Sequence, residues 1–335
     1  MSPVVVTGAS GHLGANLIRS LLAAGRPVRV MIHRQRLGLE GLDVEFVTGD
    51  VRDPGSLRRV LEGTEIVFHL AAMISIRGDQ GGLVQAINVD GVRNVAEAAL
   101  EVGVRRMVHV SSIHAFGLDD CSAPLDETRP RSTEAHEPAY NLSKAAGEVE
   151  LRRVIDRGLD ATIINPTGIV GPYDYRPSRM GRVLLQLFRR RLPALTPGGF
   201  DFVDVRDVAQ AILSAETRGE TGENYIIGGR YVSVCEIAEI AERITGVKRP
   251  RLTTPMWLAR GTAPFAEIAG TLMRREPLYT RESLSALRAN RDIRHDLATA
   301  VLDHQPRSFE ETVRDTYAWF ACNGVIAADA VRSPV

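Results

Sequence analysis

A tyrosine and a lysine stand four residues apart in the segment YNLSK (140–144). On a helix this spacing places the Tyr140 phenol and the Lys144 ammonium on one face. A phenol with an ordinary pKa of about 10 is a poor acid–base at neutral pH, and an adjacent cation stabilises its phenolate form. Lysine is also rare in this chain, because Lys144 and Lys248 are its two lysines among 41 basic residues. The pair therefore predicts a general acid–base.

Two serines follow the segment at residues 105–110, which reads as a strand. Ligands bind at the carboxyl edge of parallel sheets, where Ser112 would lie. A hydroxyl there can hydrogen-bond a substrate oxygen whose charge changes. The alternative is that these serines only cap the end of the strand and do not contact a substrate. His114, two residues further on, is a candidate substrate contact or a simple loop contact.

Glycines recur at spacing three in TGASGHLG (7–14), between a predicted strand at 3–7 and a predicted helix at 13–24. Gly8, Gly11 and Gly14 would allow a tight turn, close approach of a pyrophosphate and close packing of helix on strand. The start of the helix offers unpaired N–H groups to phosphates. The loop predicts a dinucleotide site, against the alternative of an ordinary glycine turn.

The residues after the second predicted strand (28–32) indicate which dinucleotide binds. NAD sites usually carry an acid there for the ribose hydroxyls, but this chain reads HRQR (33–36) and has no acid before Glu40. The guanidinium of Arg34 suits a 2′-phosphate. We therefore expect NADP, with NAD as the alternative. Asp50 follows the third strand (44–47) and is either an acceptor for the adenine amino group or a solvated turn residue.

Short apolar runs alternate with helical patterns through the first half of the chain, which predicts a Rossmann-type, doubly wound α/β fold with a parallel sheet. After Pro166 the rhythm breaks, and the back half predicts a smaller, mostly helical substrate lobe. The expected partition is a nucleotide-binding domain at 1–166 plus about 200–230, a substrate lobe at about 167–199 plus 231–325, and a tail at 326–335. Further strands are expected at 65–70, 161–165, 202–205 and 224–227, and further helices at 53–61, 83–100, 138–155, 179–190, 233–245 and 309–320.

Composition excludes several classes of protein. The 335 residues carry 41 basic and 41 acidic side chains, a balance that argues against a general nucleic-acid binder. Cys121, Cys235 and Cys322 are too scattered for a disulfide framework or a zinc site, which favours a cytoplasmic protein. No apolar run approaches the roughly 18 residues of a membrane span, and we expect no signal peptide, no membrane partner and no metal.

Several motifs together resemble the extended short-chain dehydrogenase/reductases, the NAD-dependent epimerase/dehydratase superfamily, over about residues 3–323. Within it the chain is most similar to dihydroflavonol-4-reductase-like and hopanoid-associated sugar epimerase-like proteins. The motifs are TGASGHLG (7–14), GDVRD (49–53), HLAA (69–72), NVDGVRNVAEAA (88–99), VSSIHAFG (110–117), YNLSK (140–144) and NPTGIVGP (165–172).

The resemblance implies roles for individual residues. Tyr140 would be the general acid–base, Lys144 would lower its pKa and hold the ribose, and Ser112 would orient the carbonyl. A homodimer is also implied. The implied cofactor contacts are Gly8, Ser10, Gly11, His12, Leu13, Gly14, Arg34, Asp50, Val51, Leu70, Ala71, Ala72, Tyr140, Lys144, Pro166 and Ile169. The candidate substrate contacts are Ile74, His114 and Thr167.

One departure from the pattern bears on the substrate. Nucleotide-sugar epimerases carry a phosphate-gripping arginine where this chain has Phe200, in FDFVDVRDVA (200–209). We therefore expect an NADP-dependent oxidoreductase, a carbonyl reductase or alcohol dehydrogenase, acting on a small or apolar ketone or aldehyde. The alternatives are an NAD(P)-dependent sugar epimerase or dehydratase, and a non-catalytic NADP-sensing regulator.

Overall fold

The computed structural model describes residues 2–33, 35–75, 78–118, 121, 123–134, 136–262, 284, 287, 290–327 and 330–331. Arg34, on which the expected preference for NADP depends, lies outside the described residues, as does most of the expected tail. The described helices include none long and apolar enough to cross a bilayer.

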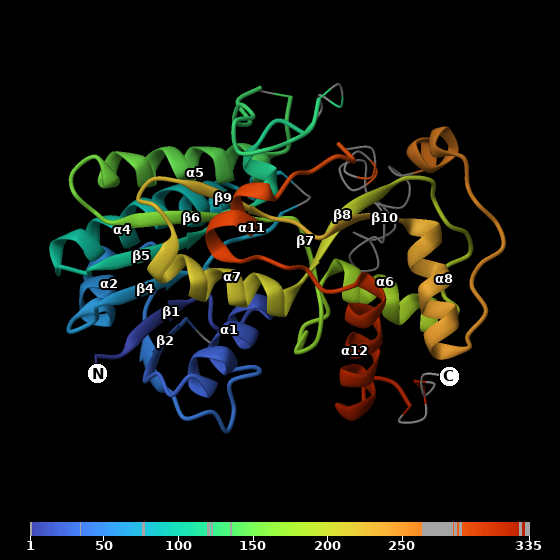
Figure 1. The fold of residues 1–335 in the computed structure, drawn as a ribbon, viewed down its shortest axis with the longest axis horizontal. Coiled ribbons are helices and arrows are strands. Elements are labelled where there is room, and N and C mark those ends of the chain that lie inside the picture. Colours follow the sequence, from blue (N-terminus) through green and yellow to red (C-terminus); the bar gives the residue numbers. More distant parts are fainter. Residues whose placement is uncertain are drawn as a thin grey trace.

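A seven-stranded sheet runs through the middle of the molecule (Figure 1), and every neighbouring pair in it is parallel. Its order reverses between β1 and β4, where a doubly wound sheet opens a ligand crevice. The predicted Rossmann-type fold is confirmed. In spatial order the strands are β3 (Glu45–Thr48), β2 (Val28–Ile32), β1 (Val4–Thr7), β4 (Ile66–His69), β5 (Arg106–Val110), β6 (Ala161–Pro166) and β9 (Asn224–Ile227).

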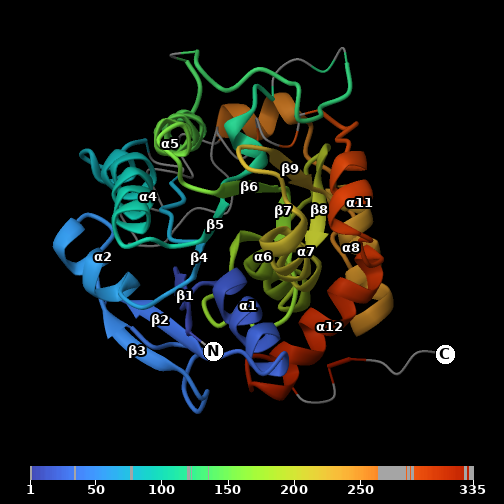
Figure 2. The same cartoon turned by 60° about the vertical axis from the view of Figure 1, so that its left-hand side comes forward.

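Helices cover both faces of this sheet (Figure 2). The central strands bury side chains on both sides, so their sequences are mostly apolar, and two separate hydrophobic clusters fill the two layers. One face is covered by α2 (Pro54–Leu61), α4 (Gly91–Glu101) and α5 (Ala139–Ile155), and the other by α1 (His12–Ala23), α7 (Val205–Arg218) and α11 (Asp296–Leu302).

A second, three-stranded sheet lies beyond the carboxyl end of the first, and its order is β10-β8-β7. The sequence predicted a strand only at 202–205, so β7 and β10 were missed. A third hydrophobic cluster joins this sheet to three helices. The elements are β7 (Gly168–Val170), β8 (Gly199–Asp204), β10 (Arg230–Ser233), α6 (Arg179–Phe188), α8 (Val234–Thr245) and α12 (Phe309–Cys322).

The helix expected at 83–100 is interrupted. It begins as α3 (Leu83–Gln85), widens into a π-helical turn, η1 (Ala86–Asp90), and continues as α4. Single π turns within α-helices are frequent at functional sites. Here the turn contains Asn88, a buried side chain that contacts both Met73 and α5.

Candidate active site

The loop between β1 and α1 is shaped for close approach of a phosphate. Gly8 has a φ of +67°, and a Cβ atom there would lie 2.7 Å from the nitrogen of Ala71. A Cβ at Gly14 would lie 2.5 Å from the carbonyl oxygen of Gly8. Side chains are therefore excluded from both positions, and the N–H groups at the start of α1 stay open to an anion. This cradle fits the pyrophosphate of a dinucleotide.

Thr7 joins the loop to the neighbouring strand. Its hydroxyl oxygen accepts hydrogen bonds from the backbone N–H groups of Leu70 and Ala71, both at 3.2 Å. Its own hydrogen is then left for Nδ1 of His69, 2.7 Å away. Thr7 thus holds the end of β4 beside the glycine loop, and both segments are predicted to contact the cofactor.

The other predicted cofactor residues occupy varied settings. Ser10, Gly11 and Ala72 are exposed, Leu13 is half-buried, and Val51 is buried. The His12 imidazole contacts the carbonyl oxygens of Gly171 at 3.1 Å and Pro172 at 3.0 Å, so it links α1 to the segment that follows β7. The predicted contact of His12 with the cofactor is therefore left to its backbone.

The Asp50 carboxylate already has partners. It pairs with Nη2 of Arg52 at 2.6 Å and lies 3.4 Å from Nε2 of His33. The hydrogen bond from Arg52 lowers the pKa of Asp50 below its usual value, so this carboxylate is ionised at neutral pH. A contact with adenine, which remains a prediction, would have to share the carboxylate with Arg52.

Tyr140 lies in the first turn of α5 beside Ser112, which precedes the 3₁₀ turn η2 (Ile113–Ala115). Burial raises the pKa of the phenol, whereas a hydrogen bond with the Ser112 side chain and the positive charge of Arg179 act in the opposite direction. The structure thus brings Ser112 and Tyr140 together. Arg179, the first residue of α6, is a charge near the phenol that sequence reasoning did not identify.

Lys144 is almost completely buried, with 3% of its surface exposed. Its ammonium group donates to the carbonyl oxygen of Val110 at 3.0 Å. Burial lowers the pKa of Lys144 to about 8, although the Glu148 carboxylate acts to raise it. The Lys144 ammonium therefore lies at the end of β5, where burial favours its neutral form and Glu148 favours its charged form.

Two stacked histidines lie in the sheet near Lys144. His69 on β4 and His109 on β5 are neighbours in the strand register, and their ring centroids are 5.2 Å apart. Burial lowers the pKa of His69 to about 3 and lowers the pKa of His109 well below its ordinary value, and Lys144 adds to both effects. Both rings are uncharged at neutral pH.

His114 and Phe200 form an aromatic wall beside Tyr140. The His114 ring stacks on Phe200 with centroids 5.8 Å apart and an interplanar angle of 11°, and it meets the Tyr140 ring edge-on at 5.7 Å. Burial lowers the pKa of His114 to about 4, so the imidazole is neutral. Among the other predicted substrate residues, Thr167 is buried just after β6 and Ile74 is 68% exposed.

Residues 4–228 match the model of the "NAD dependent epimerase/dehydratase family". The chain belongs to this family. It is 40% identical to "Sterol demethylase protein B" of Methylococcus capsulatus, over 96% of this chain and 99% of that protein. It is 32% identical to "Putative dihydroflavonol 4-reductase" of Synechocystis, over 96% and 95%. A solved structure titled "Crystal structure of gox2253" superposes with a TM-score of 0.84 at 33% identity, covering 97% of this chain and 99% of that chain.

Membership of the epimerase/dehydratase family, together with reductase-named relatives, supports an NAD(P)-dependent oxidoreductase. The chain carries the family's cofactor cradle on the first turn of its sheet, and it places a serine and a tyrosine side by side at the carboxyl edge of that sheet. Phe200, the position at which the sequence resemblance predicts the loss of a phosphate-gripping arginine, is part of this aromatic wall.

Sequence reasoning assigned no role to two buried polar residues, Asn88, which is the first residue of the motif at 88–99, and Glu148. Asn88 accepts from the backbone N–H of Met73 at 2.7 Å and donates to Oγ of Ser143 at 2.9 Å, so it ties the 71–75 segment to α5. Glu148 is 1% exposed. Its spacing, four residues after Lys144, was a signal that could have identified it.

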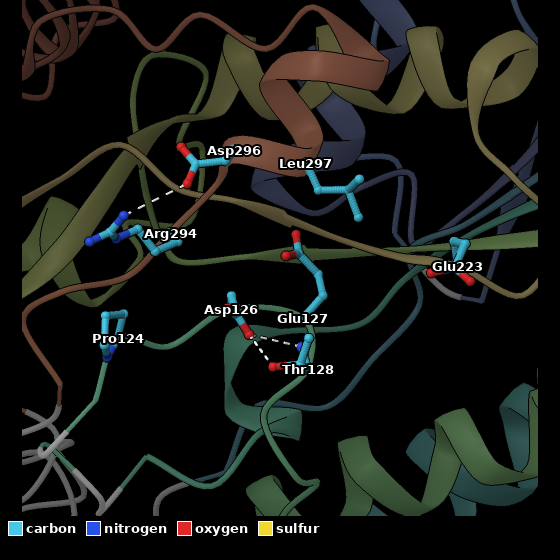
Figure 3. Close-up of a pocket in the computed structure, with 8 residues that line it drawn as sticks. All are labelled: Pro124, Asp126, Glu127, Thr128, Glu223, Arg294, Asp296 and Leu297. Atoms are coloured by element: carbon cyan, nitrogen blue, oxygen red, sulfur yellow. Dashed lines mark hydrogen bonds and ion pairs between the residues drawn. The ribbon is translucent and has the colours of Figure 1, made fainter.

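A pocket on another part of the surface shares no residue with this site (Figure 3). Glu127 points into it and accepts from the backbone N–H of Ile226 at 2.8 Å, while Asp126 bonds Thr128 within its own turn. These carboxylates satisfy local backbone and side-chain donors. Within the described ranges, no cluster of three or more His, Cys, Asp or Glu residues could hold a metal ion. The lining residues are Pro124, Asp126, Glu127, Thr128, Glu223, Arg294, Asp296 and Leu297.

Proposed function

We propose that the protein is an NADP-dependent oxidoreductase that interconverts a secondary alcohol and a ketone, or an aldehyde and its alcohol, on an apolar substrate. Bound NADP would supply or accept hydride at C4 of its nicotinamide. Tyr140 would donate a proton to the carbonyl oxygen during reduction and take it back during oxidation. Ser112 would hydrogen-bond the same oxygen, and Lys144 would hold the cofactor ribose and favour the phenolate.

The observation that carries the apolar substrate is the stack of Phe200 on His114 beside the Tyr140 ring. Both rings are uncharged, and Phe200 is 9% exposed. A wall of this kind favours contact with hydrocarbon over contact with a diphosphate. The name of the 40% identical relative, "Sterol demethylase protein B", agrees with a substrate of low polarity.

The choice of NADP is supported by the segment after β2. Residues 33–39 contain no acid, so no carboxylate there repels a 2′-phosphate. His33, the last described residue before Arg34, is exposed and close to Asp50. Arg34 is the cation proposed to pair with the phosphate. The glycine cradle accommodates either dinucleotide, so discrimination is assigned to this segment. A cytoplasmic homodimer and the two-lobe partition of the chain complete the proposal.

The test is a substrate panel followed by one substitution. Purified protein with NADPH is offered apolar ketones and aldehydes, including sterol ketones, while the absorbance of the reduced nicotinamide is followed. UDP- and dTDP-sugars are offered separately with NAD⁺ or NADP⁺ and their products are separated by chromatography, because epimerases and dehydratases return the nicotinamide to its starting oxidation state. We expect turnover of an apolar carbonyl compound. Tyr140→Phe should retain cofactor binding and lose about 10²–10⁴-fold in turnover.

Tyr317→Phe is the matched control, because it also removes a buried phenol hydroxyl, one that donates to the Leu184 carbonyl at 2.8 Å in the other lobe. Its turnover should stay near that of the wild type. Comparable activity of the Tyr140→Phe variant would refute the role of the phenol. Turnover of a nucleotide sugar would favour epimerase or dehydratase chemistry, and NADP binding without turnover across the panel would favour a sensor.

A further inference from the structure

Glu148 is a buried carboxylate on the face of α5 that carries Tyr140 and Lys144. The three residues are spaced at successive intervals of four, so they follow one another along the helix. Only 1% of the Glu148 surface is exposed. A carboxylate buried to this extent is costly unless cations and donors compensate it.

Three side chains from other parts of the fold bond this carboxylate. Arg131 donates at 2.8 Å and Asn224 at 3.0 Å to one oxygen, and Asn165 donates at 2.7 Å to the other. Asn165 also donates to the carbonyl oxygen of Ser112 at 3.0 Å. Glu148 is therefore connected to the main chain of Ser112 through a single residue, Asn165, which is itself fully buried.

We propose that Glu148 is a positioning residue of the active site, which holds the main chain of Ser112 through Asn165 and keeps Lys144 a cation. The roles of Ser112 and Lys144 in turnover rest on the proposed function. The geometry of Ser112 and the charge of Lys144 do not, because both are properties of the protein without a substrate.

The groups that face Lys144 make its charge sensitive to Glu148. Glu148 acts on its charge from α5, and His69 from β4 and His109 from β5 also interact with it, while Tyr140 lies four residues before it on the same helix. The two histidines are uncharged at neutral pH, and burial raises the pKa of the phenol. Lys144 therefore changes its charge near pH 8 while these neighbours keep theirs, and Glu148 supplies the negative charge that favours the ammonium form.

The two lysines of this chain allow a direct test. Protein labelled with ¹³C at Cε of lysine gives one NMR signal each for Lys144 and Lys248, and Lys248→Arg assigns them. We expect the Lys144 signal of the wild type to titrate near pH 8. In Glu148→Gln the midpoint should fall by about one unit or more, because an opposite charge on the same helix face has been removed.

Two further variants separate charge from shape. Glu150→Gln is the matched control on α5, since Glu150 pairs with the exposed Arg153, and it should leave the Lys144 midpoint unchanged. Arg131→Gln removes the competing cation from Glu148, so the Lys144 midpoint should rise. Because Arg131 lies in a loop, this variant decides the question if Glu148→Gln does not fold, as judged by circular dichroism.

Kinetics with a substrate from the panel test whether Glu148 positions Ser112 through Asn165. Glu148→Asp keeps the charge but withdraws the carboxylate from Asn165, so kcat should fall while the Lys144 midpoint stays in place. In Glu148→Gln the loss of kcat with rising pH should begin at a lower pH than in the wild type. An unmoved Lys144 midpoint in folded Glu148→Gln, or in Arg131→Gln where Glu148→Gln does not fold, overturns the effect of Glu148 on the charge of Lys144. An unchanged kcat in Glu148→Asp overturns the positioning of Ser112. If the midpoints move as expected but no substrate reacts, the proposed function alone fails.

Discussion

Replacing Lys144 with methionine should stabilise the fold slightly at pH 7, and this gain in the free energy of unfolding should be lost as the pH rises. Burial lowers the pKa of Lys144 from 10.5 to about 8. Each pKa unit corresponds to about 1.4 kcal/mol, so the protonated lysine costs the folded state about 3 kcal/mol at pH 7. Methionine has a similar length and no charge. It leaves the Val110 carbonyl without its donor, at a cost of about 1–3 kcal/mol, so the net gain should be small.

The pH dependence is the sharper part of this prediction. Between the folded pKa of about 8 and the unfolded value of 10.5, the unfolded chain binds more protons at Lys144 than the folded protein does. The free energy of unfolding of the wild type therefore rises with pH over this interval. Lys144→Met lacks that rise, so its stability relative to the wild type should decline by about 3 kcal/mol from pH 7 to above pH 10.

Urea unfolding followed by far-ultraviolet circular dichroism measures this difference at several pH values. Titrating groups that do not interact with Lys144 contribute equally to both proteins and cancel. Lys248→Met is the control, because Lys248 is exposed, and its stability relative to the wild type should not vary with pH. A constant difference between Lys144→Met and the wild type across this range would refute the burial of a titrating cation. The same variant should lose turnover.

Three further substitutions test the cofactor and substrate assignments. Arg34→Ala should reduce the preference for NADP⁺ over NAD⁺ about ten-fold or more in calorimetry. Arg36→Ala is the control and should leave this preference unchanged, because the Arg36 guanidinium lies 4.4 Å from the centroid of the Phe46 ring. Equal affinities of the wild type for the two cofactors would contradict the NADP assignment. Gly14→Ala should destabilise the fold by about 1–3 kcal/mol in thermal unfolding and weaken NADP⁺ binding, because its Cβ would lie 2.5 Å from a carbonyl oxygen; wild-type values for both would contradict the tight turn. Phe200→Ala should raise KM for an apolar substrate more than it lowers kcat, and an unchanged KM would remove the ring from the substrate site.

The parallel sheet was predictable because its central strands are buried on both faces. Val4–Thr7 and Ile66–His69 are fully buried, so each reads as a continuous apolar run that ends at a turn or at the glycine loop. The second sheet was not predictable in the same way. β7 has three residues and β10 begins with the exposed Arg230, and both pair with β8 from distant parts of the sequence. Such short strands carry no periodic signal of their own.

In the candidate site too, features set by local sequence were predictable and features set by distant elements were not. The glycine loop and the Tyr140–Lys144 pair are local patterns, and the structure places them as their spacing predicts. The pKa changes are not local, because they depend on what other elements bury. We expected Lys144 to lower the pKa of Tyr140, but the described contacts that act in this direction come from Ser112 and Arg179. The effect of Lys144 on the phenol therefore remains a prediction for the complex with cofactor.

The arrangement around Lys144 shows how one buried cation is kept between α5 and the carboxyl end of β5. A second positive charge at His69 or His109 would repel it, and burial prevents either ring from becoming charged at neutral pH. Glu148 supplies the compensating negative charge from the same helix, and its remaining acceptor capacity is taken up by other donors. The ammonium charge is thus retained without a direct ion pair to the phenol. Burial of Tyr140 itself raises the pKa of its phenol, so the phenol is protonated at neutral pH, the state from which the proposed reduction of a carbonyl would start.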